Sequence, residues 1–180
     1  MAPALIGYFP KRTRQRPDWL EAAGVDEVCS VSTCVSSGPG DWIQRWRHNA
    51  LWVYDSPALA WSVVPESARG EFDLYAYRMY PVEWAAGARR PLAMPPLPGL
   101  EPLDASFARL GHDVVSRSAG TSFECSPLSC NSMAREHPVN RHCLIEDAAT
   151  AFRLAGEFES GSGEPGPYCV IEVWRQGRAA

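Results

Sequence analysis

The sequence predicts an α+β protein in which a single twisted, mostly mixed sheet of about six to eight strands carries short helices. Segments 71–82 and 168–175 are rich in aromatic and β-branched residues, and residues 147–158 have the apolar spacing of a helix. The 180 residues are 46% hydrophobic and 21% charged, as in ordinary globular proteins. We therefore expect one globular domain over residues 1–180.

The first half of the chain alternates short strands with short helices. Apolar runs predict strands at 4–9, 25–32, 51–54 and 71–82, the first of them ended by Pro10. Proline in a first turn or a capping side chain predicts three helices, which start at Pro17, after Asp41 and after Ser56. Residues 11–16 carry four cations and should form a loop between the first strand and the first helix.

The second half begins with five prolines between residues 89 and 102, which predict a long ordered loop. A capped helix at 104–110, ended by Gly111, should lead into a strand at 113–118. Smaller elements are expected as strands at 122–126 and 143–145 and as a short helix capped by Asn131. The last two predicted elements are a helix at 147–158, which packs on the sheet, and a strand at 168–175, which belongs to it.

Two charged residues interrupt apolar strand faces. Alternation places Arg78 among Phe72, Leu74, Ala76 and Tyr80 on one side of its strand. A buried guanidinium needs a carboxylate or an anionic ligand, because leaving it unpaired costs several kcal/mol. Glu172 interrupts the final strand in the same way, so we expect these two residues to pair, with an anionic ligand at Arg78 as the alternative.

Composition and charge exclude several classes of protein. The net charge of -4 argues against a general nucleic-acid binder. No stretch approaches the roughly 18 apolar residues of a membrane span, and the N-terminal charges follow the apolar run instead of preceding it as in a secretory signal. We therefore expect a cytoplasmic protein whose six cysteines are thiols or metal ligands.

The cysteines form two pairs with the same spacing, Cys29-x4-Cys34 and Cys125-x4-Cys130. Four thiolates brought together would suit zinc or an iron–sulfur cluster, and this spacing lets both members of a pair reach one metal. His137, His142 and Cys143 are close enough in sequence to replace one pair. The alternative is that these cysteines are buried, reduced thiols.

The segment 122–143 also contains the parts of a cysteine nucleophile. Cys125 or Cys130 would be the thiolate, His137 or His142 the base, and Glu124, Glu136 or Asn140 the group that orients the base. Cys130 directly precedes the helix that Asn131 would cap, and a helix N-terminus lowers a thiol pKa. This pattern predicts a reactive thiol as the second interpretation.

A third interpretation rests on the order of elements. The basic loop at 11–16, the Tyr- and Arg-rich strand and the segment Thr121-Ser122-Phe123-Glu124 follow one another in an order similar to that of ADP-ribosyltransferase-like domains. The resemblance implies that Glu124 is the catalytic acid and that Arg12 or His48 contacts a nicotinamide cofactor. No complete motif of that family is matched.

Gly-rich phosphate loops, His-Glu-x-x-His and Gly-x-Ser-x-Gly do not occur. The function we favour is a small binding or interaction protein whose cysteine-rich loop is stabilised by zinc, with a protein or a small molecule as its partner. The alternative is an enzyme, with Glu124, Cys130 and His142 as catalytic residues and Arg12, His48 and Arg78 as ligand contacts. The predicted metal ligands are Cys29, Cys34, Cys125 and Cys130.

Overall fold

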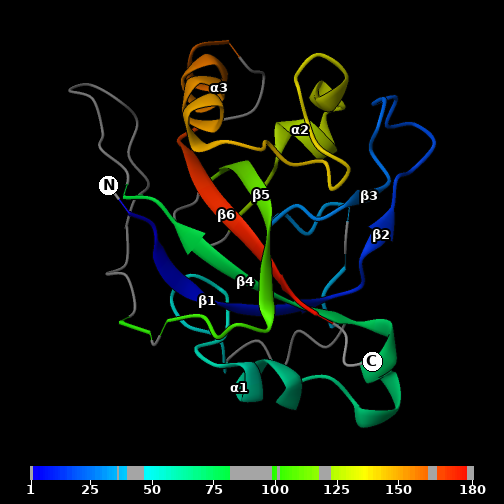
Figure 1. Ribbon diagram of the computed structural model, residues 1–180, viewed down its shortest axis with the longest axis vertical. Coiled ribbons are helices and arrows are strands. Elements are labelled where there is room, and N and C mark those ends of the chain that lie inside the picture. Colours follow the sequence, from blue (N-terminus) through cyan, green and yellow to red (C-terminus); the bar gives the residue numbers. More distant parts are fainter. Residues whose placement is uncertain are drawn as a thin grey trace.

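A four-stranded antiparallel sheet forms the centre of the computed structural model, with strand order β1-β4-β6-β5 (Figure 1). Its strands are β1 (Ala4–Lys11), β4 (Asp73–Met79), β5 (Phe107–Ser116) and β6 (Tyr168–Gln176). Two short strands, β2 (Arg14–Gln15) and β3 (Glu27–Val28), pair with each other. The structure describes residues 2–35, 37–39, 47–81, 99–100, 102–117, 123–161 and 166–177.

The helices are short, apart from the last one. They are α1 (Pro57–Ser62), the 3-10 helix η2 (Glu66–Glu71), α2 (Pro127–Cys130), the 3-10 helix η3 (Met133–Arg135) and α3 (Ala148–Gly161). In α1 the Ser56 hydroxyl accepts a hydrogen bond from the Leu59 N–H, as its capping sequence predicts. None of the helices in the described part has the length and apolar character needed to cross a membrane.

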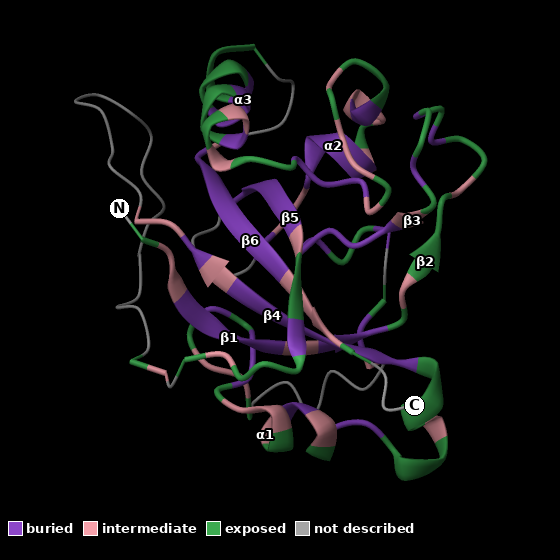
Figure 2. Ribbon diagram, viewed as in Figure 1, coloured by how far each residue is buried: buried purple, intermediate pink, exposed green. Residues whose placement is uncertain are grey.

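The two faces of the sheet are covered differently. On one face, β4 residues such as Leu74 pack with α1, and β6 residues such as Val170 pack with α3. On the other face, Tyr75 and Tyr77 pack against connecting segments that carry Val31, Val53 and Phe123. Figure 2 shows the result: β4 is almost wholly buried, β6 is buried up to Val173 and partly exposed beyond it, and α3 exposes its outer side.

The predicted pairing of Arg78 with Glu172 is confirmed. The two residues are directly opposite each other in the β4–β6 register, and Arg78 Nη1 lies 3.0 Å from Glu172 Oε2. The same carboxylate oxygen accepts a hydrogen bond from Trp174 Nε1 at 3.2 Å. Arg78 therefore has a structural partner in the strand next to it, and an anionic ligand is not needed to balance its charge.

The α+β class is confirmed, but the sheet is smaller than predicted and antiparallel, not mixed. Within the described ranges it has four strands, and the 25–32 segment contributes only the two residues of β3. The predicted strands at 51–54 and 143–145 are reduced to single bridges, Tyr8 to Tyr54 and His112 to Ile145. Their apolar residues are buried beside the outer strands β1 and β5, which explains the alternation without a continuous ladder.

Two predicted helices and one strand boundary are wrong. Residues 104–110 belong largely to β5, where pairing with β6 overrides the local capping signals, and Gly111 lies in a bulge instead of ending a helix. The segment from Pro17 forms only a turn. Pro10 lies inside β1 because its nitrogen, like the Tyr8 N–H that bonds to Tyr54, faces away from β4, so no ladder bond to β4 is lost.

One helix and two strands with clear local sequence patterns were predicted correctly. The predicted helix at 147–158 is α3, and the predicted strands at 71–82 and 168–175 contain β4 and β6. The helix after Asp41 and most of the proline-rich segment 89–102 lie outside the described residues.

Candidate metal centre

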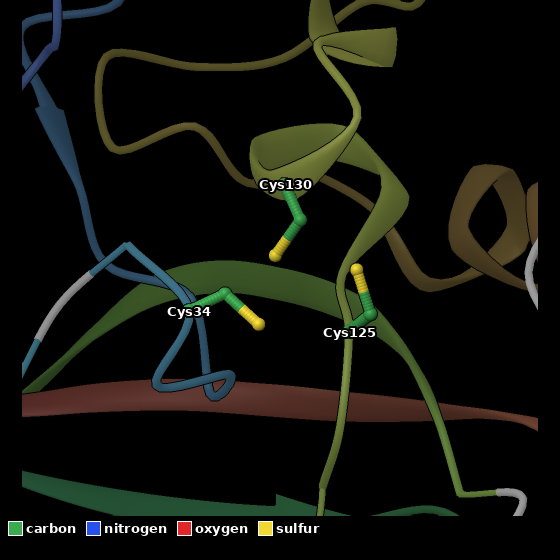
Figure 3. A group of neighbouring side chains, drawn as sticks. All are labelled: Cys34, Cys125 and Cys130. Atoms are coloured by element: carbon green, nitrogen blue, oxygen red, sulfur yellow. The ribbon is translucent and has the colours of Figure 1, made fainter.

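Three cysteine sulfurs converge at one place on the molecule (Figure 3). Cys34 belongs to the turn after β3, Cys125 to the segment before α2, and Cys130 is the last residue of α2. Their Sγ atoms all lie within 4.8 Å of one another and point into a common space. Sulfurs that share a tetrahedral zinc ion, with Zn–S bonds of about 2.3 Å, are about 3.8 Å apart. A small inward movement would therefore let all three bind one ion.

The single turn of α2 brings Cys130 back beside Cys125. Pro127 occupies the first turn of the helix, and the Cys130 N–H donates to the Ser126 carbonyl at 2.8 Å. The short helix predicted after Asn131 is the 3-10 helix η3, but Ser132 and not Asn131 precedes it, and Cys130 is the last residue of the separate helix α2. The N-terminus of a helix therefore does not activate the Cys130 thiol, and its acidity has other causes.

The Ser32 side chain joins the two segments that carry the sulfurs. Its hydroxyl donates to the Glu124 carbonyl at 2.6 Å and accepts a hydrogen bond from the Cys34 N–H at 3.2 Å. It also lies 3.6 Å from Cys130 Sγ. Ser32 therefore holds the turn that carries Cys34 next to Glu124, the residue before Cys125.

A buried lysine holds the segment before Cys34 in place. Lys11 is 1% exposed, and its ammonium donates to the carbonyls of Ser30, Val31 and Ser32 at 2.6, 3.0 and 2.8 Å. These three bonds use all the protons of the ammonium group. Lys11 therefore fixes the backbone that leads into Cys34, and the expectation that it belongs to an exposed cationic loop is wrong.

A buried carboxylate, Asp113, connects this segment to α2. Asp113 Oδ2 accepts hydrogen bonds from Ser30 Oγ at 2.6 Å and from the Val31 N–H at 2.8 Å. Asp113 Oδ1 accepts one from Ser126 Oγ at 2.6 Å. Since Ser126 is the residue before α2, one side chain of β5 positions both halves of the cysteine group.

The sulfurs differ in acidity. Hydrogen bonds from the Cys125 side chain and from Ser32 lower the pKa of Cys130 to about 6, although burial opposes the shift. Burial raises the pKa of Cys34. At neutral pH the metal-free group therefore contains a thiolate at Cys130 beside a protonated thiol at Cys34, and a soft cation that binds them displaces the remaining protons.

This acidity predicts the first site of alkylation in the metal-free protein. At pH 7 we expect iodoacetamide to modify Cys130 before the buried Cys29 and Cys143, because the thiolate is the nucleophile and burial raises the pKa of both other thiols to about 12. The rate at Cys130, measured by peptide mass spectrometry from pH 5 to 9, should rise to half its maximum near pH 6 and then level off. A rate that still increases through pH 9, as for an ordinary thiol, would contradict the assignment.

Cys29, the fourth predicted metal ligand, belongs to a different group with Glu27 and His142. Arg175 Nη1 lies 2.9 Å from Glu27 Oε1 and donates to Cys29 Sγ at 3.9 Å. His142 Nδ1 lies 2.6 Å from the same Glu27 oxygen. A guanidinium already balances this carboxylate, and burial keeps the Cys29 thiol protonated, so this group is a poor metal site.

The predicted catalytic bases do not join the three sulfurs. His142 lies with Glu27, and the His137 ring packs edge-on against Phe158, with ring centroids 5.7 Å apart. Glu124 is adjacent to Cys125, and its carbonyl accepts hydrogen bonds from the Ser32 hydroxyl and the Cys34 thiol. The arrangement gives no support to a cysteine–histidine nucleophile.

Arg12 and His48, the residues expected to hold a nicotinamide cofactor, each contact another side chain of the protein. Arg12 Nη2 lies 2.8 Å from Glu71 Oε2 at an exposed position. The His48 ring stacks on Trp52 with centroids 4.4 Å apart. These contacts give no geometric support to the resemblance to ADP-ribosyltransferases.

The polar residues that support the site, Lys11 and Asp113, were not predicted from the sequence. Lys11 is the only lysine in the chain, and it stands at the end of an apolar strand. Asp113 interrupts the buried end of β5, just as Arg78 interrupts β4. The rule that identified the Arg78–Glu172 pair could therefore have identified Asp113 as a buried charge that needs partners.

Comparisons with models of protein families, with curated proteins and with solved structures gave no match to this chain. The function of the protein is therefore inferred from the geometry of the cysteine group.

Proposed function

We propose that the protein binds one zinc ion through Cys34, Cys125 and Cys130, and that the ion ties the turn after β3 to α2. One observation carries this proposal: sulfurs from segments far apart in sequence lie within 4.8 Å of one another. Reduced cysteines that served only as apolar core residues would not need to converge in this way, and Cys34 is exposed.

The chemistry of the ligands favours zinc over harder metal ions. Thiolates are soft ligands that suit zinc, whereas magnesium and calcium require oxygen ligands. An iron–sulfur cluster is ordinarily held by four cysteines, and the group contains three among the described residues. A single zinc ion is therefore the best fit.

Three protein ligands leave one position of a tetrahedral zinc ion for water or for a molecule from solution. The Ser32 hydroxyl, 3.6 Å from Cys130 Sγ, already donates to the Glu124 carbonyl. An open position is typical of zinc sites that bind or activate a ligand. We infer that the protein is a zinc-dependent binding protein, with metal-assisted chemistry at the same position as the second candidate.

The test compares variants of predicted ligands and non-ligands in protein purified without chelator. Elemental analysis of the wild type should give about one zinc per chain. Cys34→Ser is the best ligand variant, because the side chain is exposed and its loss should leave the fold intact. Its zinc affinity should fall at least about tenfold, the usual scale for losing a group that supports a metal site. Cys29→Ala is the matched control and should keep full zinc content.

Cobalt replacement gives an independent measurement of the ligands. Co²⁺ in the wild type should produce sulfur-to-metal charge-transfer absorption and the intense visible bands of four-coordination, both weakened in Cys125→Ser. Wild-type protein that takes up neither zinc nor cobalt would disprove the proposal. Loss of zinc from Cys29→Ala, with retention by Cys34→Ser, would move the site to the group with Glu27 and His142.

A further inference from the structure

A cavity of about 120 Å³ opens on the face of the sheet that the connecting segments cover. It is smaller than an enclosed apolar cavity of about 150 Å³ that holds benzene, but it is open to solvent on one side, so a single ring can enter with its substituent outside. Aromatic rings supply most of the wall, and the described lining includes no carboxylate, lysine or arginine. The lining residues that matter here are Phe9, Thr33, His48, Trp52, Tyr77 and Phe123.

Tyr77, in β4, is one of the lining residues, and its hydroxyl has no hydrogen-bond partner in the described part of the chain. The residue is 1% exposed, and no described residue forms a hydrogen bond with its hydroxyl. Burial raises the pKa of Tyr77 well above 10, so the phenol stays protonated and can donate. A buried hydroxyl without a partner is costly, and native proteins rarely leave one. Tyr75, two residues earlier, bonds to Thr13 and to the Cys29 sulfur.

Trp52 is held at the edge of the cavity in an unfavourable backbone conformation. Its φ is +62°, which is a true outlier for a bulky residue, and its side chain is 39% exposed. Asn49 imposes the turn: its carbonyl accepts from the Trp52 N–H, and its side-chain oxygen accepts from the Leu51 N–H. The indole stacks on His48. Backbone strain that keeps a large ring exposed beside a cavity is typical of binding sites.

We propose that this cavity binds a small, neutral, single-ring aromatic molecule whose acceptor atom takes a hydrogen bond from the Tyr77 hydroxyl, with Trp52 covering the ring. The cavity size limits the ligand to one ring, and the absence of charged groups in the described lining favours a neutral molecule. Two of the lining residues, Thr33 and Phe123, lie one and two residues before Cys34 and Cys125 in the sequence. The proposal does not depend on a bound metal.

The test uses two ring-sized probes on the full chain: benzamide, which has an acceptor oxygen, and toluene, which has none. Binding is followed by NMR through the tryptophan indole N–H signals, with the Trp52 signal assigned from its loss in Trp52→Asn. Asparagine tolerates a positive φ, so this variant removes the ring without adding backbone strain. Both probes should shift the Trp52 signal, and benzamide should bind about tenfold more tightly. Both should bind more weakly to Trp52→Asn, which is measured by saturation transfer to the probe signals because this variant has no Trp52 indole.

Two conservative variants separate the hydroxyl from the ring. Tyr77→Phe should bind toluene as before and lose the tenfold preference for benzamide, with no loss of stability, because the hydroxyl has no described partner. Tyr75→Phe is the matched control and should keep the preference. The proposal is overturned if neither probe shifts the Trp52 signal at millimolar concentration, or if Tyr77→Phe keeps the full benzamide preference.

Discussion

Asp113→Ala is expected to lower the free energy of unfolding by about 3–5 kcal/mol, as when one partner of a buried ion pair is removed. Asp113 is 0% exposed, and it is linked to Lys11 through Ser30, which accepts from the ammonium and donates to the carboxylate. Both carboxylate oxygens act only as acceptors in their described bonds, as expected for the ionised form. Without Asp113, Lys11 loses the negative charge that opposes the lowering of its pKa by burial, and its three carbonyl partners carry no charge to replace it.

Urea unfolding of the metal-free protein measures this effect without a contribution from zinc. Asp18→Ala, at an exposed position, is the control and should change stability by less than about 0.5 kcal/mol. In a double-mutant cycle, Lys11→Met combined with Asp113→Asn should cost clearly less than the sum of the two single changes. If the costs are additive, or if Asp113→Ala loses less than about 1 kcal/mol, the buried pair is not an important source of stability.

Asp113 also matters for the proposed function, because it holds both segments that carry the sulfurs. Asp113→Asn keeps the size of the side chain but removes its charge and one acceptor oxygen. We expect weaker zinc binding in this variant even where the protein remains folded, since Ser30 and Ser126 would no longer be held by one carboxylate.

Gly7→Ala is expected to cost at least about 2 kcal/mol of stability, from backbone strain and overpacking together. Gly7 lies at the bulge of β1 with a φ of +144°, where the 51–54 segment crosses the strand. A Cβ there would lie 2.6 Å from Val53 Cγ2 and 2.7 Å from the Tyr54 carbonyl oxygen. The backbone oxygen cannot move without breaking the Tyr8–Tyr54 bridge.

Two other glycines serve as controls for the causes of that loss. Gly24 has a φ of +77° and open space around it, so Gly24→Ala should show the backbone cost alone. Gly156 lies in α3, also in open space, and Gly156→Ala should stabilise the protein by about 0.5–1 kcal/mol. Chemical denaturation should show the largest loss of stability for Gly7→Ala, a smaller loss for Gly24→Ala and a gain for Gly156→Ala. A Gly7→Ala loss equal to that of Gly24→Ala would show that the close contact relaxes freely.

Elements with a strong local signal could be predicted from the sequence. The Ser56-Pro57 start of α1 and the apolar spacing of α3 depend on residues a few positions apart. The β4 and β6 segments are recognisable because their alternation continues over many residues. The pairing of Arg78 with Glu172 followed from the cost of burying a single charge, which applies wherever the partner lies.

Elements whose conformation depends on distant partners could not be predicted. Residues 104–110 have helical capping signals, yet pairing with β6 makes most of them a strand. The segments 51–54 and 143–145 have the alternation of strands, but each forms only a single bridge to an outer strand of the sheet. In each case long-range packing contributes more free energy than local propensity, which amounts to less than about 1 kcal/mol per residue.

The sequence by itself determined that this is an α+β protein with buried charges in need of partners and with cysteines at repeated spacing. Only the tertiary structure decided which cysteines come together. The turn after β3 places Cys34 with Cys125 and Cys130, whereas Cys29 packs beside Arg175 in another group. Spacing along the chain limits how far apart two sulfurs can be, but the positions of segments joined by long connections depend on how the sheet packs and on the hydrogen bonds of Lys11 and Asp113.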